Sequence, residues 1–526
     1  CLIDDLSWAL KFMEVPIDWK HVEEMAVFIH ETQSSSSRGF HNVEHAFEVT
    51  GGASPVQMIA AFFRDTVVHY VDGGINPKQK QLLEGVFIPN TYKICPEFLE
   101  DEMFRMVMEL FGIRTSESVE DQYELDRGMD ILLSAIIVVK FLRDYIPKWQ
   151  LAQIIVCMER TIPFRGQDDL GRSASDGLYN RLVDVNQSFK LGMPEGELEM
   201  TCQMATDLSN RIMGIYAAPD PDKFIAQTWG LLPELYSALR QNSLYSLKDF
   251  YFAVWDMHRF VESVDPSIYD TFRGIPKEAE IIDFQKAFVK NQTVGATYLK
   301  LKVVEVATLT ALAILTGGAD VPKSMFYGDL GLREMPALGD TLPQLDPREV
   351  ARHGCYVEVY DMMYKPRTME ASFDQTNAPI AAYIYGMIGE LTLKLVFEKC
   401  VHPLTTEGSW DLIELLPFDV VDTIAKEIGH VAPSRADRLE ETLFELRNNS
   451  SLSRMASWSV PMGRNRASFT GPKQSLGSGQ KESSVLCNRA WGLIFGIRFQ
   501  FGDVLGKGGV GHFEISIARK LYQQDY

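Results

Sequence analysis

The stretch RGFHNVEHAFEVTGGASPVQMIAAFFRDTVVHYVDGG, residues 38–74, decides how the first half of the chain is interpreted. Apolar residues recur in it at spacings of three and four on both sides of a central Gly-Gly pair. This periodicity is typical of amphipathic helices. It predicts one helix over 41–49 and a second over 55–69.

Side chains capable of metal or proton chemistry gather in these two predicted helices. His41 and His45 are four residues apart and would lie on one helical face, and the same spacing relates Asp65 to His69. A neutral imidazole is a common metal ligand, and a second histidine can act as a general acid. Asn42 would lie beside them as a hydrogen-bonding partner. We therefore expect a polar site, although two histidines at this spacing also occur as a simple surface pair.

The rest of the chain has the same helical texture. Alternating strand patterns are scarce, and proline and glycine fall mainly between the periodic segments. Further helices are predicted over 18–32, 129–146, 195–212, 221–239, 247–264 and 281–315. The expected fold class is therefore mainly α.

The periodicity fades over 317–376, where glycine, proline and aspartate become frequent, and it returns over 378–446. We expect a helical domain over 1–316 and a second, mostly helical region over 317–526. The role of the second region is open among dimerisation, substrate selection and regulation, so a homo-oligomer is one expectation. Residues 448–484 are rich in serine and glycine and predict a flexible surface segment, or alternatively a regulatory loop that contacts an anion.

The composition excludes several classes of function. The net charge of −20 argues against general nucleic-acid binding, because phosphate contacts need clustered lysine and arginine. A small anionic substrate remains compatible, since a metal or local arginines can reverse the field in one cleft. The seven cysteines are scattered without CxxC spacing, as in a cytoplasmic protein with reduced thiols. The longest apolar runs are interrupted at Lys140 and Glu305, and we expect neither a membrane span nor a signal peptide.

The motif FHNxxHAFxV, residues 40–49, is followed one predicted helix later by an apolar run that ends in the charged pair Arg64-Asp65. This arrangement resembles the HD superfamily of metal-dependent phosphohydrolases. The resemblance is to the branch with YHNxxHAxDV, which includes the cyclic-nucleotide phosphodiesterases. It implies an all-helical HD domain and hydrolysis of a phosphoester in a small, nucleotide-like compound by a metal-activated water.

The resemblance also implies roles for single residues. His45 and Asp65 would be metal ligands, with Asp65 bridging, and His41 would protonate the leaving group. His69 matches the histidine that follows this aspartate in the phosphodiesterase branch. The further aspartate that the family needs is matched by Asp207 in CQMATDLSNR, for which the alternative is an ordinary surface aspartate.

A substrate pocket is expected around the sequence MERTIPFRG, where related proteins often have Thr-x-x-His and this chain has Thr161-Ile-Pro-Phe. Glu159 and Arg165 would line the pocket, with Arg165 as a phosphate clamp. Asn42 and Arg64 complete the expected substrate-binding residues.

Arg64 departs from the family, which has histidine at this position, and a guanidinium cannot ligate a metal. Three interpretations are open. His45, Asp65 and Asp207 alone would hold Mg²⁺, Mn²⁺, Fe or Zn²⁺, and the chain would be a phosphohydrolase. Alternatively, Arg64 replaces the metal, which gives a catalytically decayed sensor or scaffold that binds a phosphorylated ligand. In the third interpretation Arg64 turns outward into a salt bridge. Retention of the other site residues favours an enzyme.

Overall fold

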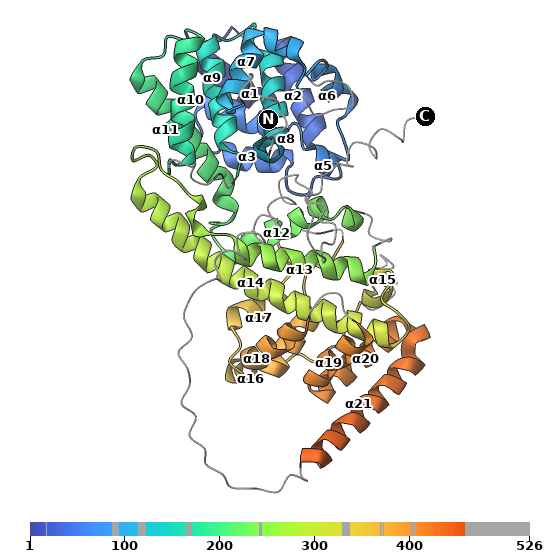
Figure 1. The fold of residues 1–526 in the computed structure, drawn as a ribbon. Coiled ribbons are helices and arrows are strands. Elements are labelled where there is room, and N and C mark those ends of the chain that lie inside the picture. The colour runs from blue at the N-terminus through green and yellow to red at the C-terminus, as the bar shows by residue number, and fades with distance from the viewer. Residues whose placement is uncertain are drawn as a thin grey trace, which may run out of the picture. The chain divides into compact units, whose positions relative to one another are not determined.

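All regular elements that the structure describes are helices (Figure 1). The computed structural model describes residues 1–457 except 17, 87–93, 114–122, 164, 166–170, 241–244, 329–336, 369–370, 372 and 401–404. Within these ranges the only β-type pairings are two isolated bridges. The predicted mainly α fold is confirmed.

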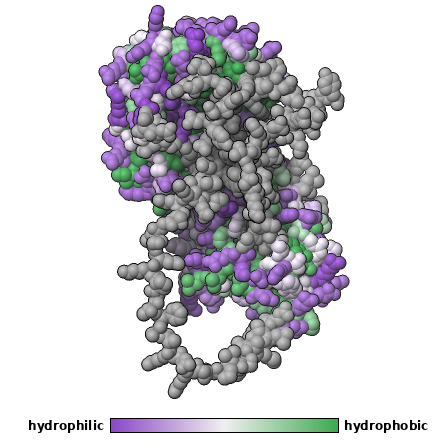
Figure 2. Space-filling model, in the orientation of Figure 1, coloured by the Kyte–Doolittle hydropathy of each residue, from purple (hydrophilic) through white to green (hydrophobic). Residues whose placement is uncertain are grey.

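Backbone contacts divide the described chain into two compact units. The first unit comprises residues 1–217 and 265–286, and the second comprises residues 218–264 and 287–457. The domain boundary predicted after residue 316 falls inside the second unit. Figure 2 shows hydrophilic residues over most of the described surface that is visible in that view, with small apolar areas between them.

The first unit is built around one central helix. Its helices are α1 (Leu2–Phe12), α2 (Trp19–Gln33), α3 (Val43–Thr50), α4 (Pro55–Arg64), α5 (His69–Asp72), α6 (Pro77–Leu82), α7 (Glu102–Leu110), α8 (Tyr123–Leu142), α9 (Lys148–Arg160), α10 (Ala174–Ser188) and α11 (Glu195–Ile212). Helix α9 packs against α4, α7, α8, α10 and α11 and is buried throughout from Gln150 to Arg160. A helix that is covered on all sides in this way belongs to the core.

The helix predicted over 55–69 is wrong in its last third. A capping box at Ser54 starts α4, but the helix ends at Arg64, and α5 begins only at His69. The β-branched run Thr66-Val67-Val68 favours helix weakly. Side chains from other helices take its backbone groups: Gln79 Nε2 donates to the Thr66 carbonyl, and Val67 N–H donates to Ser134 Oγ at 3.0 Å. Asp65 and His69 therefore do not share a helical face.

The helix predicted over 41–49 begins two residues later than expected. Asn42 is the N-cap of α3, and its Oδ1 accepts the His45 backbone N–H at 2.9 Å. His41 precedes this cap and lies in the loop after α2. The prediction that His41 and His45 share one helical face is therefore also wrong, because the helix begins after Asn42 and includes only His45.

The second unit contains α12 (Pro221–Leu235), α13 (Leu247–Ser263), most of α14 (Glu278–Leu315), α15 (Lys323–Tyr327), α16 (Pro347–Arg352), α17 (Val357–Tyr364), α18 (Pro379–Lys399), α19 (Thr406–Leu415), α20 (Phe418–Val431) and α21 (Ala436–Ser457). Because α21 continues to Ser457, the first part of the segment predicted to be flexible is helical, and residues 458–484 of it lie outside the described residues. Among described helices, α18 alone is long and apolar enough to cross a membrane by length and composition, and most of its apolar window is buried in this structure.

The core of the second unit holds a cluster of buried charges, Lys302, Glu305, Lys323, Arg367 and Asp374, here called the ionic cluster. Lys302 Nζ lies 2.8 Å from Glu305 Oε1 and 3.4 Å from Asp374 Oδ2. Lys323 Nζ lies 3.2 Å from Asp374 Oδ1, and Arg367 Nη2 lies 3.3 Å from Asp374 Oδ2. Asp374 is thus the centre of the cluster.

Aromatic rings compensate the excess of cations over carboxylates in the ionic cluster. Lys323 Nζ lies 4.4 Å from the ring centroid of Tyr327 and 5.0 Å from that of Phe250. The Arg367 guanidinium lies 4.6 Å from the ring centroid of Trp229. Faces of aromatic rings attract cations, most strongly where water is excluded. The cluster therefore joins α12, α13, α14, α15 and the segment before α18.

Helix α18 is kinked at Gly389, which has φ 71° and ψ 173°. A Cβ at this position would clash with the His353 carbonyl oxygen. We expect Gly389→Ala to destabilise the second unit by about 2–3 kcal/mol, because the backbone conformation is costly for any residue with a Cβ. Gly429→Ala in α20 is the control, since its Cβ would make only ordinary contacts. Chemical denaturation of both variants checks this, and equal effects would contradict it.

His258 on α13 is a buried imidazole whose two ring nitrogens have no hydrogen-bond partner among the described residues. Its ring centroid lies 4.8 Å from that of Phe397, and Nε2 lies 3.5 Å from Glu262 Oε1. Burial, with smaller contributions from Lys300 and Arg259, lowers the pKa of His258 to about 3. The folded protein therefore holds this histidine neutral.

Acid is expected to weaken the second unit through His258. Below the ordinary histidine pKa of about 6.5, His258 is protonated in the unfolded chain but stays neutral in the folded chain. The free energy of unfolding therefore falls by up to about 1.4 kcal/mol for each pH unit of acidification. His258→Leu should make the unfolding free energy depend less steeply on pH between pH 6 and 4, by up to the slope of about 1.4 kcal/mol per pH unit. His430→Leu, at an exposed position on α20, is the control and should leave the slope unchanged. An unchanged slope in His258→Leu would show that another group governs this range.

Candidate functional site

The end of α4 carries a buried ion pair between Arg64 and Asp65. Arg64 Nη1 lies 2.5 Å from Asp65 Oδ1, and Arg64 Nε donates to Thr161 Oγ1 at 3.1 Å. The residues are 3% and 8% exposed, so the pair is enclosed by the protein. Arg64 is therefore directed at Asp65, and the outward-facing interpretation does not hold.

The electrostatics of this pair extend to His41 and His45. Burial would raise the pKa of Asp65, but Arg64, His41 and His45 outweigh it, and the pKa falls to about 2. Burial lowers the pKa of His45 to about 4; the nearby Asp65 opposes this change, and His41 and Arg64 add to it. At neutral pH Asp65 is therefore ionised and His45 is neutral. The structure brings these four residues together, as the sequence predicted.

Asp207 lies apart from this group. Its Oδ2 accepts hydrogen bonds from Gln57 Nε2 at 2.8 Å and from Arg211 Nε at 2.7 Å. Gln57 belongs to the first turn of α4, whereas Asp65 follows the last residue of that helix. At 1.5 Å per residue the two positions are roughly 12 Å apart along the helix axis. Asp207 is thus paired at the opposite end of α4.

The donor set does not fit a divalent cation. No group of three or more His, Cys, Asp or Glu side chains that could hold a metal occurs in the part of the chain that the structure describes. Of the predicted ligands, Asp207 is bound to Arg211, and Oδ1 of Asp65 faces Arg64. The positive charge beside the carboxylate is that of the guanidinium.

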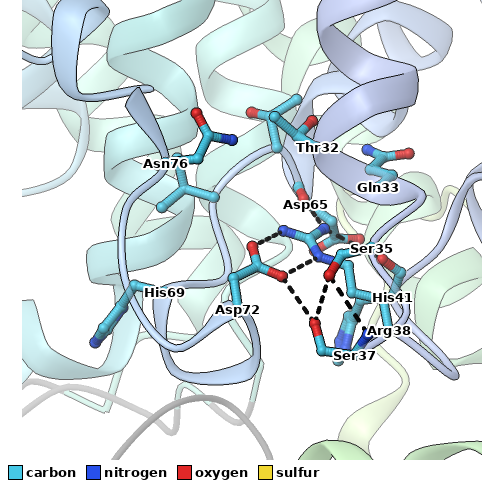
Figure 3. Close-up of polar contacts among 12 residues, drawn as sticks. Thr32, Gln33, Ser35, Ser37, Arg38, His41, Asp65, His69, Asp72 and Asn76 are labelled. Atoms are coloured by element: carbon cyan, nitrogen blue, oxygen red, sulfur yellow. Dashed lines mark hydrogen bonds and ion pairs between the residues drawn. The ribbon is translucent and has the colours of Figure 1, made fainter. Parts of the chain in front are cut away.

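His69 belongs to a separate pair. Its Nδ1 lies 2.5 Å from Asp130 Oδ1, and its backbone N–H donates to the same oxygen at 3.4 Å. In Figure 3 the His69 ring points away from Asp72 and Arg38. No pattern in the sequence pointed to Asp130, which comes from α8.

The predicted pocket residues Glu159 and Arg165 form an ion-pair group of their own. The buried Glu159 accepts hydrogen bonds at Oε1 from Arg165 Nη1 and, at 2.5 Å, from Arg181 Nη2. Asn42 likewise has a local partner, since its Nδ2 donates to the Gly39 carbonyl at 3.2 Å. These contacts assign Asn42 to the α3 cap and Arg165 to Glu159.

Arg38 and Asp72, which the sequence analysis did not include among the site residues, organise the site. The guanidinium of Arg38, in the loop between α2 and α3, bonds both carboxylate oxygens of Asp72 at the end of α5. It also donates to the carbonyls of His41 and Asp65 (Figure 3). A buried arginine needs such partners, but the sequence contains no sign of which ones.

No protein-family model, no curated protein and no solved structure matches the chain. The assignment of function therefore depends on the arrangement of the residues themselves.

Proposed function

We propose that the chain is a non-hydrolytic protein with an HD-like site, in which the Arg64 guanidinium takes the place of a divalent cation. Its role is that of a sensor or scaffold for a small phosphorylated or nucleotide-like ligand. The observation that carries this proposal is the buried contact of 2.5 Å between Arg64 Nη1 and Asp65 Oδ1. The contact supplies the positive charge that a metal would bring to the carboxylate.

The metal-dependent phosphohydrolase is the second candidate. It is favoured by the protonation states of His45 and Asp65, because a neutral imidazole and an ionised carboxylate are the forms that bind metals. It requires Arg64 to move away from Asp65 and a third ligand to approach.

Metal content distinguishes the two candidates. We expect wild-type protein, purified without chelator and soaked with Mn²⁺ or Mg²⁺, to carry no stoichiometric metal by elemental mass spectrometry. Arg64→His should gain a metal, because it removes the competing cation and adds a nitrogen ligand. Arg143→His is the control, since Arg143 belongs to the same unit but pairs with Asp101, at 2.7 Å, and not with Asp65.

The opposite result is equally clear. A stoichiometric metal in the wild type that disappears in Asp65→Ala would establish a working metal site and favour the phosphohydrolase. Calorimetric titration of the wild type with nucleoside monophosphates and cyclic nucleotides then measures binding. Analysis of the products shows whether a bound compound is hydrolysed.

A further inference from the structure

The side chain of Arg38 is completely buried although it lies in a loop. Its exposed fraction is 0%, and that of its partner Asp72 is 16%. A fully buried arginine occurs in proteins only where charge and hydrogen bonds compensate the loss of water. We therefore expect the contacts of Arg38 to compensate the burial of its charge.

Those contacts join three separate stretches of the chain. Arg38 Nε donates to Asp72 Oδ1 at 2.9 Å, and Nη2 donates to Asp72 Oδ2 at 2.6 Å. Nη1 donates to the His41 carbonyl at 3.2 Å and to the Asp65 carbonyl. One guanidinium thus connects the loop before α3, the end of α4 and the end of α5, as Figure 3 shows.

The arrangement depends on the shape of the guanidinium. Two parallel hydrogen bonds to a carboxylate fix the plane of an arginine fork. Because Asp72 sets this plane, the opposite edge of the guanidinium has one orientation. In that orientation Nη1 of Arg38 donates to the backbone carbonyls of His41 and Asp65. A lysine ammonium carries the same charge but lacks the planar fork.

We propose that Arg38, oriented by Asp72, is the positioning residue that holds the loop of His41 against Asp65. Asp72 is then an anchor of the site rather than a ligand of its substrate. This inference deepens the proposed function, because it explains how His41 is kept beside the pair of Asp65 and Arg64. It does not depend on whether the site binds a metal.

Chemical modification of single residues tests this role. His41 is 5% exposed and should react slowly with diethyl pyrocarbonate, a reagent for neutral imidazoles. In Arg38→Met and in Asp72→Asn we expect carbethoxylation of His41, followed by peptide mass spectrometry, to accelerate at least tenfold. Alkylation of Cys157, buried in the centre of the same unit, reports global unfolding and should keep its wild-type rate.

Two further variants make the test specific. Arg38→Lys should react like Arg38→Met, because charge without the fork does not connect the carbonyls. Arg143→Met removes an arginine from an ion pair of the same unit that is about one third exposed, and it should leave His41 protected. Asp72→Asn retains the size of the side chain and serves if Arg38→Met does not fold.

Two results would overturn the inference. The first is a wild-type rate at His41 in Asp72→Asn. The second is reaction of Cys157 that rises in step with His41, which would make Arg38 a residue of general stability only. Failure of the proposed function is recognised separately, by metal in the wild-type protein, and leaves the His41 measurement unaffected.

Discussion

Asp374→Ala is expected to lower the free energy of unfolding of the second unit by about 3–5 kcal/mol, the usual cost of removing one partner from a buried ionic group. Asp374 faces Lys302, Lys323 and Arg367 in the ionic cluster. Burial would raise its pKa, but these cations outweigh burial and hold the pKa far below the ordinary value. Without this carboxylate, Glu305 would be the one carboxylate left in the ionic cluster beside three buried cations.

Denaturation followed by tryptophan fluorescence measures this effect, and Trp229 is a local reporter because its Nε1 donates to Asp374 Oδ2 at 3.1 Å. Asp411→Ala is the matched control. Asp411 pairs with Lys399 at 3.0 Å, but both side chains are about half exposed, and such pairs contribute at most about 1 kcal/mol. A loss in Asp374→Ala no greater than in Asp411→Ala would contradict the central role of Asp374.

The second large effect is expected from Arg64→Met, which leaves the Asp65 carboxylate buried without its guanidinium. We expect a loss of about 3 kcal/mol at neutral pH. The pKa of Asp65 should rise above its ordinary value, because burial raises it and the largest opposing cause is Arg64. Removal of both charges in Arg64→Met/Asp65→Asn should recover much of the loss.

Arg64→Met is also expected to reverse the direction in which Asp65 makes the stability depend on pH. In the wild type the pKa of Asp65 is lowered to about 2, so its contribution is present above the ordinary pKa and is lost as the pH falls below it. In Arg64→Met the pKa is raised, so the unfolded chain ionises first and stability is lost as the pH rises. The difference in unfolding free energy between the two proteins should therefore grow from pH 4 to pH 7. A constant difference, or a double variant no more stable than the single one, would contradict the ion pair.

Apolar periodicity predicted the helical fold because it depends on residues close in sequence. The break between α4 and α5 also had a local signal, the β-branched run after Asp65, and the 55–69 prediction gave it too little weight. The cap at Asn42 could have been read in the same way, since asparagine favours this position.

The partners of the site residues were beyond such reasoning. Arg38 with Asp72 and His69 with Asp130 meet only after separate helices pack, and Asp207 has Arg211 one turn away as a competing partner. The sequence placed Arg64 beside Asp65, but whether the guanidinium faced the carboxylate or solvent depended on burial, which the tertiary structure decides.

Because the first unit consists of two separate stretches of the chain, a ribosome that starts at the N-terminus completes this unit late. Arg160, at the end of the central helix α9, pairs with Asp270 at 3.0 Å. The Asn210 side chain bonds the backbone of the same residue at 2.7 Å. Residues 218–264 of the second unit are synthesised before Asp270 emerges. During translation Arg160 therefore lacks its carboxylate until the second unit has begun, and a fragment that stops at residue 217 never acquires it.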